Sequence, residues 1–420
     1  MKTTLRPWLW ALSGFVLLVV AIVLIGFIRS MGHTSSARSE PTVVQPPLTP
    51  LIEAQSTVGP ELTEGQATAW TNGQKIAVDS QGRIHVVYQY EAPFDEPGTI
   101  VYASSPDGTT WIREAWSGRY PTIAVGPDDR VYLVYVERSQ NADYLWLRWK
   151  DPQSDWQSRQ LLEAPSRSLF YPALVVGREA LHLVWESHQP QMHAIHYLRF
   201  PWKESLPTAT ITPATVVSGD QGVFFPSLAE DGQGELHLVW ETSRDGMNHR
   251  LDAAVRTSAG RWVITPDLMP SVADAGSASL SLSSTREILL TFVAHESQLK
   301  SALYVLRYAN GRWEKPDELE YQGKMKGAAY DQPVVAFPAQ AAGLILWGHT
   351  VPAACGTGPL YWAYQNADGQ WSDPQPLTGD FASFPQLVER PRGVWHILWT
   401  DRDAKALRAF EVRYLKLDLH

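Results

Sequence analysis

The chain has 420 residues, a formal net charge of -9 and a single cysteine, Cys355. Nucleic-acid binding depends on clustered Lys and Arg, so the acidic balance and the lack of a basic cluster argue against a nucleic-acid partner. One cysteine excludes an intrachain disulfide, and the sequence has neither a CxxC nor an HExxH zinc pattern. The 18 Trp, 16 Tyr and 12 Phe, with 29 Gly and 30 Pro, are typical of many short strands joined by tight turns.

The N-terminus contains an uncharged apolar stretch, residues 8–28, which is long enough to cross a bilayer as a helix. Lys2 and Arg6 precede it and Arg29 follows, a pattern compatible with a cytoplasmic N-terminus. We predict a signal-anchor helix within residues 1–29, which makes the chain a single-pass protein of the cell membrane with an extracytoplasmic head. The alternative is a cleaved secretory signal and a secreted product.

A linker and one repeat domain follow. Residues 30–65 are rich in Ser, Thr, Pro and Gln without apolar periodicity, which predicts an extended linker. Residues 66–420 carry a repeated strand that ends in an aromatic residue and recurs about every 50 residues. Two copies are identical, "LHLVWE" at Leu181–Glu186 and at Leu236–Glu241. The seven aromatic residues are Tyr88, Tyr135, Trp185, Trp240, Phe292, Trp347 and Trp399.

Each copy also contains other short strands. One precedes the aromatic strand and is often opened by an aromatic residue and Pro, as in "RYPTIAV" and "FFPSLAE". A third strand follows, and a fourth often begins at a Trp beyond a turn. This pattern predicts an all-β fold, a seven-bladed β-propeller of four-stranded blades. The seventh copy ends after its third strand, so we expect the segment near Leu62–Trp70 to supply the fourth and close the ring.

The turn "SPDGTTW", Ser105–Trp111, resembles the Asp-box (BNR repeat) of sialidase-like β-propellers, although it is one residue shorter. In that superfamily the turn joins the third and fourth strands of a blade. Its Asp is expected to cap turn amides, its Gly to adopt a conformation that other residues resist, and its Trp to pack between blades. The resemblance covers residues 69–420 in architecture and implies no particular activity.

In propellers, the turns before the first strand and between the second and third strands open on one face around the central channel, which we call the channel mouth. Acidic and basic groups there are suited to a charged or hydroxyl-rich ligand, and Tyr120, Tyr171, Phe225, Tyr330 and Phe384 offer stacking surfaces. Alternatively, the charged groups pair between blades and the aromatic rings pack the blades. The predicted ligand-binding residues are Glu91, Arg119, Tyr120, Glu137, Arg138, Tyr171, Glu186, His188, Glu241, Arg244, His295, Tyr330, Asp331, His349, Asp401 and Arg402.

The histidines fall into two groups. His85, His182, His237 and His396 occupy the same place in four copies, so we expect them to serve the blade and not a chemical step. His188, His193 and His196 occur once, in a stretch expected at the mouth. A metal site there is an alternative, but neither spacing nor added carboxylates specify one. We therefore expect no metal and no cofactor.

Two catalytic hypotheses remain open. The sialidase resemblance implies three arginines that bind a substrate carboxylate. Arg119 in "GRYPTI" suits one of them, and the other two would come from Arg138, Arg244, Arg250 or Arg402. Seven copies, however, depart from the six blades of sialidases. Seven-bladed polysaccharide lyases of related type use His, Tyr and Arg, and this likeness makes His188 and Tyr171 a candidate base and acid. The candidate catalytic residues are thus Arg119, Tyr171 and His188.

The sequence favours a non-catalytic function. The repeats are regular, and the mouth loops are short and carry no complete catalytic set. We predict a membrane-anchored, extracytoplasmic propeller that binds a glycan or an envelope or extracellular protein through its mouth. A carbohydrate-active enzyme, either a sialidase-like glycoside hydrolase or a uronate lyase, is the alternative.

Overall fold

The computed structural model describes the chain from residue 50 onward, and residues Thr49–His420 form one compact unit. The described residues are 50–59, 66–70, 72–90, 98–201, 212–243, 248–272, 274–282, 287–297, 300–314, 317–318, 329–336, 343–350, 358–365, 371–379, 382–390, 393–402 and 410–419. The expected signal-anchor helix in residues 1–29 lies outside them. No helix in the described part is long and apolar enough to span a membrane.

The described chain forms seven antiparallel sheets, which we number as blades in chain order. Blades 1 to 3 consist of β2 (Ile76–Val78), β3 (Ile84–Tyr90), β4 (Thr99–Ser105) and β5 (Ile112–Ser117); β6 (Arg119–Val125), β7 (Val131–Arg138), β8 (Ala142–Lys150) and β9 (Gln157–Pro165); and β10 (Leu169–Val176), β11 (Ala180–Gln189), β12 (Met192–Pro201) and β13 (Ala214–Gly219).

Blades 4 to 7 complete the set. They consist of β14 (Gly222–Glu230), β15 (Leu236–Ser243), β16 (His249–Arg256) and β17 (Trp262–Thr265); β18 (Ala275–Leu282), β19 (Ile288–Ser297), β20 (Lys300–Ala309), β21 (Arg312–Trp313) and β22 (Asp317–Glu318); β23 (Ala329–Ala336), β24 (Leu344–Thr350), β25 (Leu360–Tyr364) and β26 (Gln375–Pro376); and β27 (Ala382–Glu389), β28 (Val394–Arg402), β29 (Phe410–Leu419) and β1 (Pro50–Gly59).

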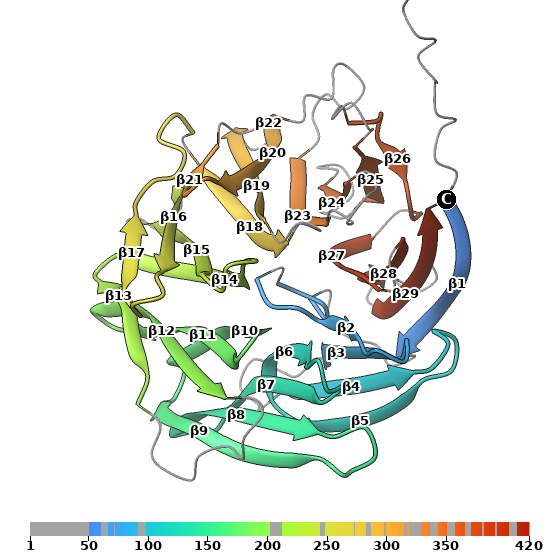
Figure 1. Ribbon diagram of the computed structural model, residues 1–420, viewed down its shortest axis with the longest axis horizontal. Helices are drawn as coiled ribbons and strands as arrows, with labels where there is room; N and C mark the ends of the chain where they lie inside the picture. Colours follow the sequence, from blue (N-terminus) through green and yellow to red (C-terminus); the bar gives the residue numbers. More distant parts are fainter. Residues whose placement is uncertain are drawn as a thin grey trace, which may run out of the picture. The chain divides into compact units, whose positions relative to one another are not determined.

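The seven sheets stand around a common centre with the first strand of each blade innermost, as Figure 1 shows. The predicted seven-bladed propeller of four-stranded blades is therefore confirmed. Closure by an N-terminal strand is also confirmed, but the segment differs from the prediction. β1 pairs with β29 from Pro50↔Leu419 to Gly59↔Val412, so the closing strand lies within the residues expected to be linker, upstream of Leu62–Trp70.

The repeated aromatic residues form the blade core. All seven, from Tyr88 to Trp399, lie within a second strand and are at most 2% exposed. Each packs within a cluster of buried aliphatic side chains, as Trp185 does beside Leu183 and Leu198. An aromatic side chain buries about 150–250 Å² on folding. This burial explains why an aromatic residue recurs at this position in every blade.

A β-bulge recurs in the first strand of blades 2 to 7, at the place of the aromatic-Pro pattern. In five of them the bulged residue is not glycine and has a positive φ between 44° and 55°. A bulge with a left-handed residue bends its strand and redirects a side chain. The five residues are Tyr120, Tyr171, Phe225, Ser277 and Phe384.

In blades 1 and 4, the residue after the repeated aromatic binds the bulge in the next blade. Gln89 Oε1 accepts a hydrogen bond from the Tyr120 amide at 3.1 Å, and Glu241 Oε1 accepts one from the Ser277 amide at 2.7 Å. Glu186 occupies the same position and faces the amide of Phe225. Glu241 thus belongs to the scaffold as well as to the mouth.

The repeated histidines join neighbouring blades. In blade 3, His182 Nδ1 shares a hydrogen bond with the Tyr197 hydroxyl at 2.8 Å, and Trp262 of blade 4 meets the Tyr197 ring edge-on at 5.3 Å. The same His–Tyr–Trp clamp, as we call it, recurs as His85–Tyr102–Trp156 and as His396–Tyr414–Trp111. His237 lacks the clamp tyrosine but lies 3.0 Å from Asp231 and meets the Tyr308 ring of blade 5 at 4.5 Å, so all four repeated histidines make contacts within the scaffold.

The turn Ser105–Trp111 joins β4 to β5, the third and fourth strands of blade 1. Asp107 Oδ1 accepts the amides of Thr109 and Thr110 at 2.8 and 3.0 Å, and Gly108 has a φ of 77°. Trp111 Nε1 donates to Ser56 Oγ of β1 at 2.9 Å. The turn therefore ties the closing strand of blade 7 to blade 1.

Candidate functional site

A cluster of aromatic rings fills the ring centre at the mouth end of the first strands. Trp70 stacks on Phe225 at 4.7 Å and meets Tyr171 and Phe384 edge-on, each at 5.7 Å. Tyr120 lies 4.5 Å from Tyr171. We call these five residues the central cluster. Its rings come from blades 2, 3, 4 and 7, so the bulges direct them inward as packing.

The segment before β2 runs into the middle of the ring (Figure 1), and it includes Trp70. On one side, the Thr68 amide donates to Thr400 Oγ1 of blade 7 at 3.0 Å. On the other, Asn72 Nδ2 donates to the Tyr171 carbonyl of blade 3 at 3.1 Å. Lys75 Nζ is buried and donates to the Gly73 carbonyl, and burial lowers the pKa of Lys75 to about 7. This segment thus connects blades 3 and 7.

A second group of side chains extends over blades 2 to 4 outside the central cluster. The Arg138 guanidinium lies 5.1 Å from the Phe170 ring, which lies 5.1 Å from His188. His188 lies 5.4 Å from Phe224, which stacks on His249 at 5.6 Å. We call these five residues the mouth track. All five are half-buried, so one side of the track faces solvent.

Each cationic or imidazole group of the track has a buried carboxylate beside it. Arg138 makes a two-pronged ion pair with Asp143, at 2.9 and 3.0 Å. Asp143 is inaccessible to solvent and also accepts the amides of Ser168 and Leu169. His249 Nδ1 lies 2.7 Å from Glu241 Oε2. The acids position the track residues and offset their charge.

Glu186 and His188 form the third of these pairs, with 3.5 Å between Glu186 Oε2 and His188 Nε2. Glu186 is 0% exposed, and burial raises the pKa of its carboxyl to about 7 despite the opposing effect of His188. Burial works to lower the pKa of His188, but Glu186 outweighs it and the pKa is raised above its ordinary value. His188 Nε2 also lies 3.1 Å from the Val223 carbonyl.

The structure distributes the other predicted site residues over several blades. Arg119 is buried in β6, while Glu137, Asp401 and Arg402 are half-buried at the ends of β7 and β28. Burial raises the pKa of Asp401. Burial also raises the pKa of Tyr171, within the central cluster. His295, Tyr330, Asp331 and His349 belong to β19, β23 and β24, and Glu91 and Arg244 lie outside the described residues.

Two of the arginines proposed for carboxylate binding are engaged within their own blades. Arg138 is paired with Asp143, as described above. Arg250 makes the equivalent pair with Asp252, at 3.0 and 3.3 Å, and Asp252 also accepts the Asp267 amide. Two of the five arginines considered for a sialidase-type triad thus hold structural acids.

The histidines of the "SHQPQMHAIH" stretch separate onto different contacts. His188 and His193 meet edge-on at 4.8 Å across β11 and β12. His196 instead stacks on Trp185 and hydrogen-bonds Ser187 Oγ at 2.8 Å. In the described part of the chain these three do not form a group able to hold a metal ion.

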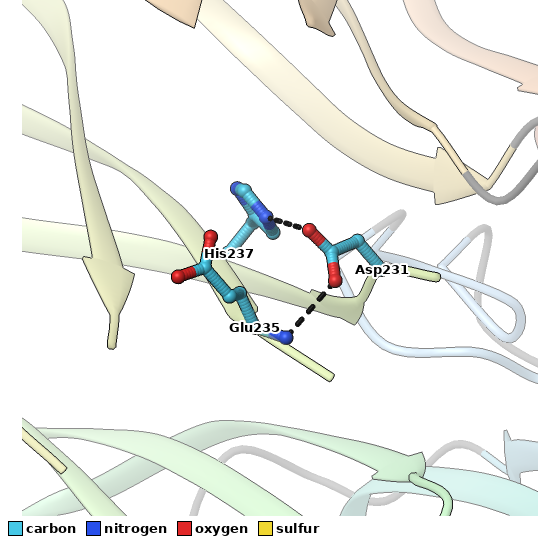
Figure 2. Close-up of side chains that lie close together, drawn as sticks. All are labelled: Asp231, Glu235 and His237. Atoms are coloured by element: carbon cyan, nitrogen blue, oxygen red, sulfur yellow. Dashed lines mark hydrogen bonds and ion pairs between the residues drawn. The ribbon is translucent and has the colours of Figure 1, made fainter. Parts of the chain in front are cut away.

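One group with the residue types of a metal site is Asp231, Glu235 and His237 (Figure 2). Asp231 Oδ1 accepts the amides of Gln233 and Glu235, and Asp231 Oδ2 lies 3.0 Å from His237 Nε2. Blade 1 repeats this arrangement around Asp79. Its Oδ1 accepts the amides of Gln81 and Arg83, and its Oδ2 lies 3.4 Å from His85 Nε2.

The blade 1 turn has Arg83 where blade 4 has Glu235, and a cation at that place is incompatible with a metal site. The shared arrangement is therefore a turn that connects the first and second strands of a blade. Asp231 acts there as a cap for turn amides and as a partner for the repeated histidine.

Comparisons with known proteins support the fold. No protein-family model and no curated protein matches the chain. Among solved structures, the polysaccharide lyase Uly1 is similar at 8% identity and a TM-score of 0.55, over 88% of this chain and 99% of its own. A protein of unknown function from Dyadobacter fermentans matches at 12% identity and 0.52, again over 88% and 99%.

An alpha-L-arabinofuranosidase from Fusarium graminearum is also similar, at 11% identity and a TM-score of 0.51, over 87% of this chain and 98% of its own. At these identities the likeness concerns the fold. The β-propeller fold that the sialidase resemblance implied is confirmed, and no specific family is matched.

Sequence reasoning missed four residues of the site: Trp70, Phe170, Phe224 and His249. Trp70 occurs in no repeated pattern. Phe170 and Phe224 left a signal, because only blades 3 and 4 have two aromatic residues before the Pro, in "LFYP" and "VFFP". The second of each pair enters the central cluster, and the first enters the mouth track.

Proposed function

We propose that this protein is a non-catalytic glycan-binding propeller that uses its channel mouth. The observation that carries the proposal is the mouth track. It combines half-buried Phe rings, which suit the apolar faces of sugars, with Arg and His edges, which suit hydroxyl groups. Proteins of similar fold that act on carbohydrates motivate the ligand class.

The state of the charged groups favours binding over turnover. A lyase or sialidase needs a cation available to a substrate carboxylate, whereas Arg138 and Arg250 are each paired with a buried Asp. Glu186 has the raised pKa of a general acid, but its carboxyl has no solvent-accessible surface. A group that water does not reach cannot protonate a bound sugar without prior rearrangement.

An enzymatic function is the second candidate, because Glu186 and Glu241 stand in adjacent blades within electrostatic range of each other. Two carboxylates of different pKa are the minimal equipment of a glycoside hydrolase. A rearrangement that exposed Glu186 would make it the candidate acid, with Glu241 as the second carboxylate. Glu186→Gln and Glu241→Gln would then each abolish turnover.

The N-terminal residues suggest how the propeller is presented. We propose that residues 8–28 anchor the chain in the cytoplasmic membrane, with the N-terminus inside and the propeller extracytoplasmic. The support is the length and the lack of charge of this stretch. Protease added to intact cells should digest the propeller and spare the anchor. A head recovered in the culture medium would instead indicate a cleaved signal, and one protected from protease would contradict export.

The decisive experiment measures binding and turnover together. The full-length protein in detergent is titrated with xylohexaose, cellohexaose, arabinohexaose, polygalacturonate and sialyllactose, and the sugars are then examined for cleavage. We expect saturable binding of at least one glycan with no cleavage. Cleavage that is lost in Glu186→Gln would replace the proposal by the enzymatic candidate. Failure of every sugar to bind would point to a protein partner, sought by cross-linking at the mouth.

A further inference from the structure

We propose that the mouth track is an extended subsite for an uncharged glycan chain, which lies across blades 2 to 4 beside the central cluster. This inference rests on the proposed glycan-binding function and specifies both the place and the class of the ligand. It assigns the ring faces of Phe170 and Phe224 to successive sugars, and the flanking Arg138, His188 and His249 to their hydroxyl groups.

The five side chains of the mouth track form a continuous row. The five side chains follow one another at 5.1 to 5.6 Å, and they alternate between a nitrogen-bearing group and a phenyl ring. Arg138 ends β7, Phe170 and Phe224 lie near the starts of β10 and β14, His188 lies near the end of β11, and His249 starts β16. All these strand ends face the mouth. A linear row fits a linear chain better than a single sugar.

The mouth track differs from the central cluster in the surroundings of its rings. The rings of the central cluster face one another, and Trp70 occupies the space between them. The track is open on one side, since the side chains of His188 and His249 are each 22% exposed. The rings of the central cluster are also half-buried, so the difference lies in their neighbours: they pack on one another, whereas Phe170 and Phe224 each lie between nitrogen-bearing groups.

The positive groups of the mouth track are neutralised by neighbouring acids. Asp143, Glu186 and Glu241 lie beside Arg138, His188 and His249 respectively, each almost or fully buried. Each possible positive charge on the track thus has a negative partner within 3.5 Å. A polyanion would gain little from such compensated groups, whereas neutral hydroxyls require only fixed donors and acceptors. The paired acids hold those donors in place.

The test is calorimetric titration of the full-length protein with xylohexaose, cellohexaose and arabinohexaose, and with hexagalacturonate as the anionic counterpart. We expect a neutral hexasaccharide to bind at least about tenfold more tightly than hexagalacturonate. Its affinity should change by less than about twofold between about 50 and about 500 mM NaCl, because no net charge is neutralised on binding.

Variants locate the subsite. Phe170→Leu and Phe224→Leu keep apolar bulk but remove the ring, and each should weaken binding about tenfold. Phe384→Leu is the matched control, because Phe384 lies on an equivalent first strand and belongs only to the central cluster. It should leave the affinity within about threefold of the unaltered protein. Thermal unfolding of each variant checks that the fold is retained.

Different failures separate the two proposals. If Phe384→Leu abolishes binding while the track variants retain it, the ligand uses the central cluster and this inference is wrong. The same holds if hexagalacturonate binds more tightly than the neutral sugars and loses affinity in salt. If none of the four oligosaccharides binds, the proposed glycan-binding function itself fails.

Discussion

His182 and His188 lie six positions apart on the same strand, yet their surroundings differ. His182 is buried between the Tyr197 hydroxyl and Glu230, at 2.8 and 3.1 Å, within the clamp that joins blades 3 and 4. His188 lies at the mouth, more exposed, between two Phe rings and above Glu186. The first recurs in other blades and the second does not.

The comparison separates two kinds of residue in this protein: those that recur in several blades and those that occur once. Residues that recur at one blade position meet needs that every blade has: a filled core, a capped turn, a bound amide or a contact with the next blade. Residues that occur once in the mouth track, such as Phe170 and His188, do not answer a need that every blade shares. We therefore expect changes in the clamps to affect stability, and changes in the mouth track to affect binding with a smaller effect on stability.

Removal of a clamp tyrosine should have the largest effect. Tyr414 is fully buried, and its hydroxyl lies 2.7 Å from His396 Nδ1 while its ring meets Trp111. Tyr414→Ala should lower the free energy of unfolding by about 3–5 kcal/mol through lost packing and the cavity left behind. Urea denaturation measures this change in the free energy of unfolding. Tyr414→Phe keeps the ring and should cost only about 1–2 kcal/mol. Equal losses in both would contradict a packing role.

The acid beneath the mouth track comes next. Asp143 is inaccessible and holds Arg138 and two amides. Asp143→Ala leaves those donors without their acceptor and should destabilise the protein by about 3 kcal/mol, the lower end for a buried pair, since Arg138 can partly rehydrate. Calorimetric unfolding provides the value. A loss below about 1 kcal/mol would show that the pair contributes little and that the track is not rigidly positioned.

Acid should weaken the clamp that contains His396. Burial lowers the pKa of His396 to about 4, below its value of 6.5 in the unfolded chain. The unfolded state therefore binds a proton first as pH falls, and stability decreases between about pH 6.5 and 4, by on the order of 2–3 kcal/mol. His396→Gln should flatten this part of a pH series of urea midpoints. An unchanged slope in the variant would assign the acid sensitivity to other groups.

At Glu186, a rise in pH should destabilise the protein. Burial raises the pKa of its carboxyl to about 7, above 4.5 in the unfolded chain, so its contribution to stability is full below about pH 4.5 and is lost as pH rises through 7. Glu186→Gln should stabilise the protein at pH 8 by about 1–2 kcal/mol, less than burial alone implies, because His188 offsets part of the charge. Destabilisation at pH 8 would mean that the ionised carboxylate has a necessary partner.

The smallest effect is expected from metal ions. Asp231, Glu235 and His237 form a turn that blade 1 repeats without the second acid, so Zn²⁺ or Ca²⁺ should leave the thermal midpoint unchanged and EDTA should not lower it. A rise of several degrees that disappears in Asp231→Asn would overturn the assignment of this group as a structural turn.

Much of the fold could be predicted from the sequence, because core positions such as Trp185 and Trp240 meet the same demand in every blade. The closing strand was expected near Leu62–Trp70, but it lies earlier in the chain, at Pro50–Gly59. β1 lies on the outer edge, where Leu51 and Ile52 are more than half exposed, so it lacks the apolar run of an inner strand.

The site was less accessible to prediction, for a physical reason. The pairs Arg138–Asp143 and Glu241–His249 join strands whose register the sequence does not specify. The same residues therefore fitted both a charged rim and a set of internal ion pairs. Trp70 could not be placed at all, since a single aromatic residue in a non-repeating segment has no counterpart in another blade. Glu241, predicted as a ligand-binding residue, also binds the bulge of the next blade.

Hydrogen–deuterium exchange of the full-length protein tests the central claim most directly, with and without the neutral hexasaccharide that binds best. The account predicts slowed exchange at the mouth ends of β10, β11, β14 and β16, and unchanged exchange in the clamps and at Ser105–Trp111. Slowed exchange confined to the segment around Trp70, or to the face that carries Ser105–Trp111, would contradict it.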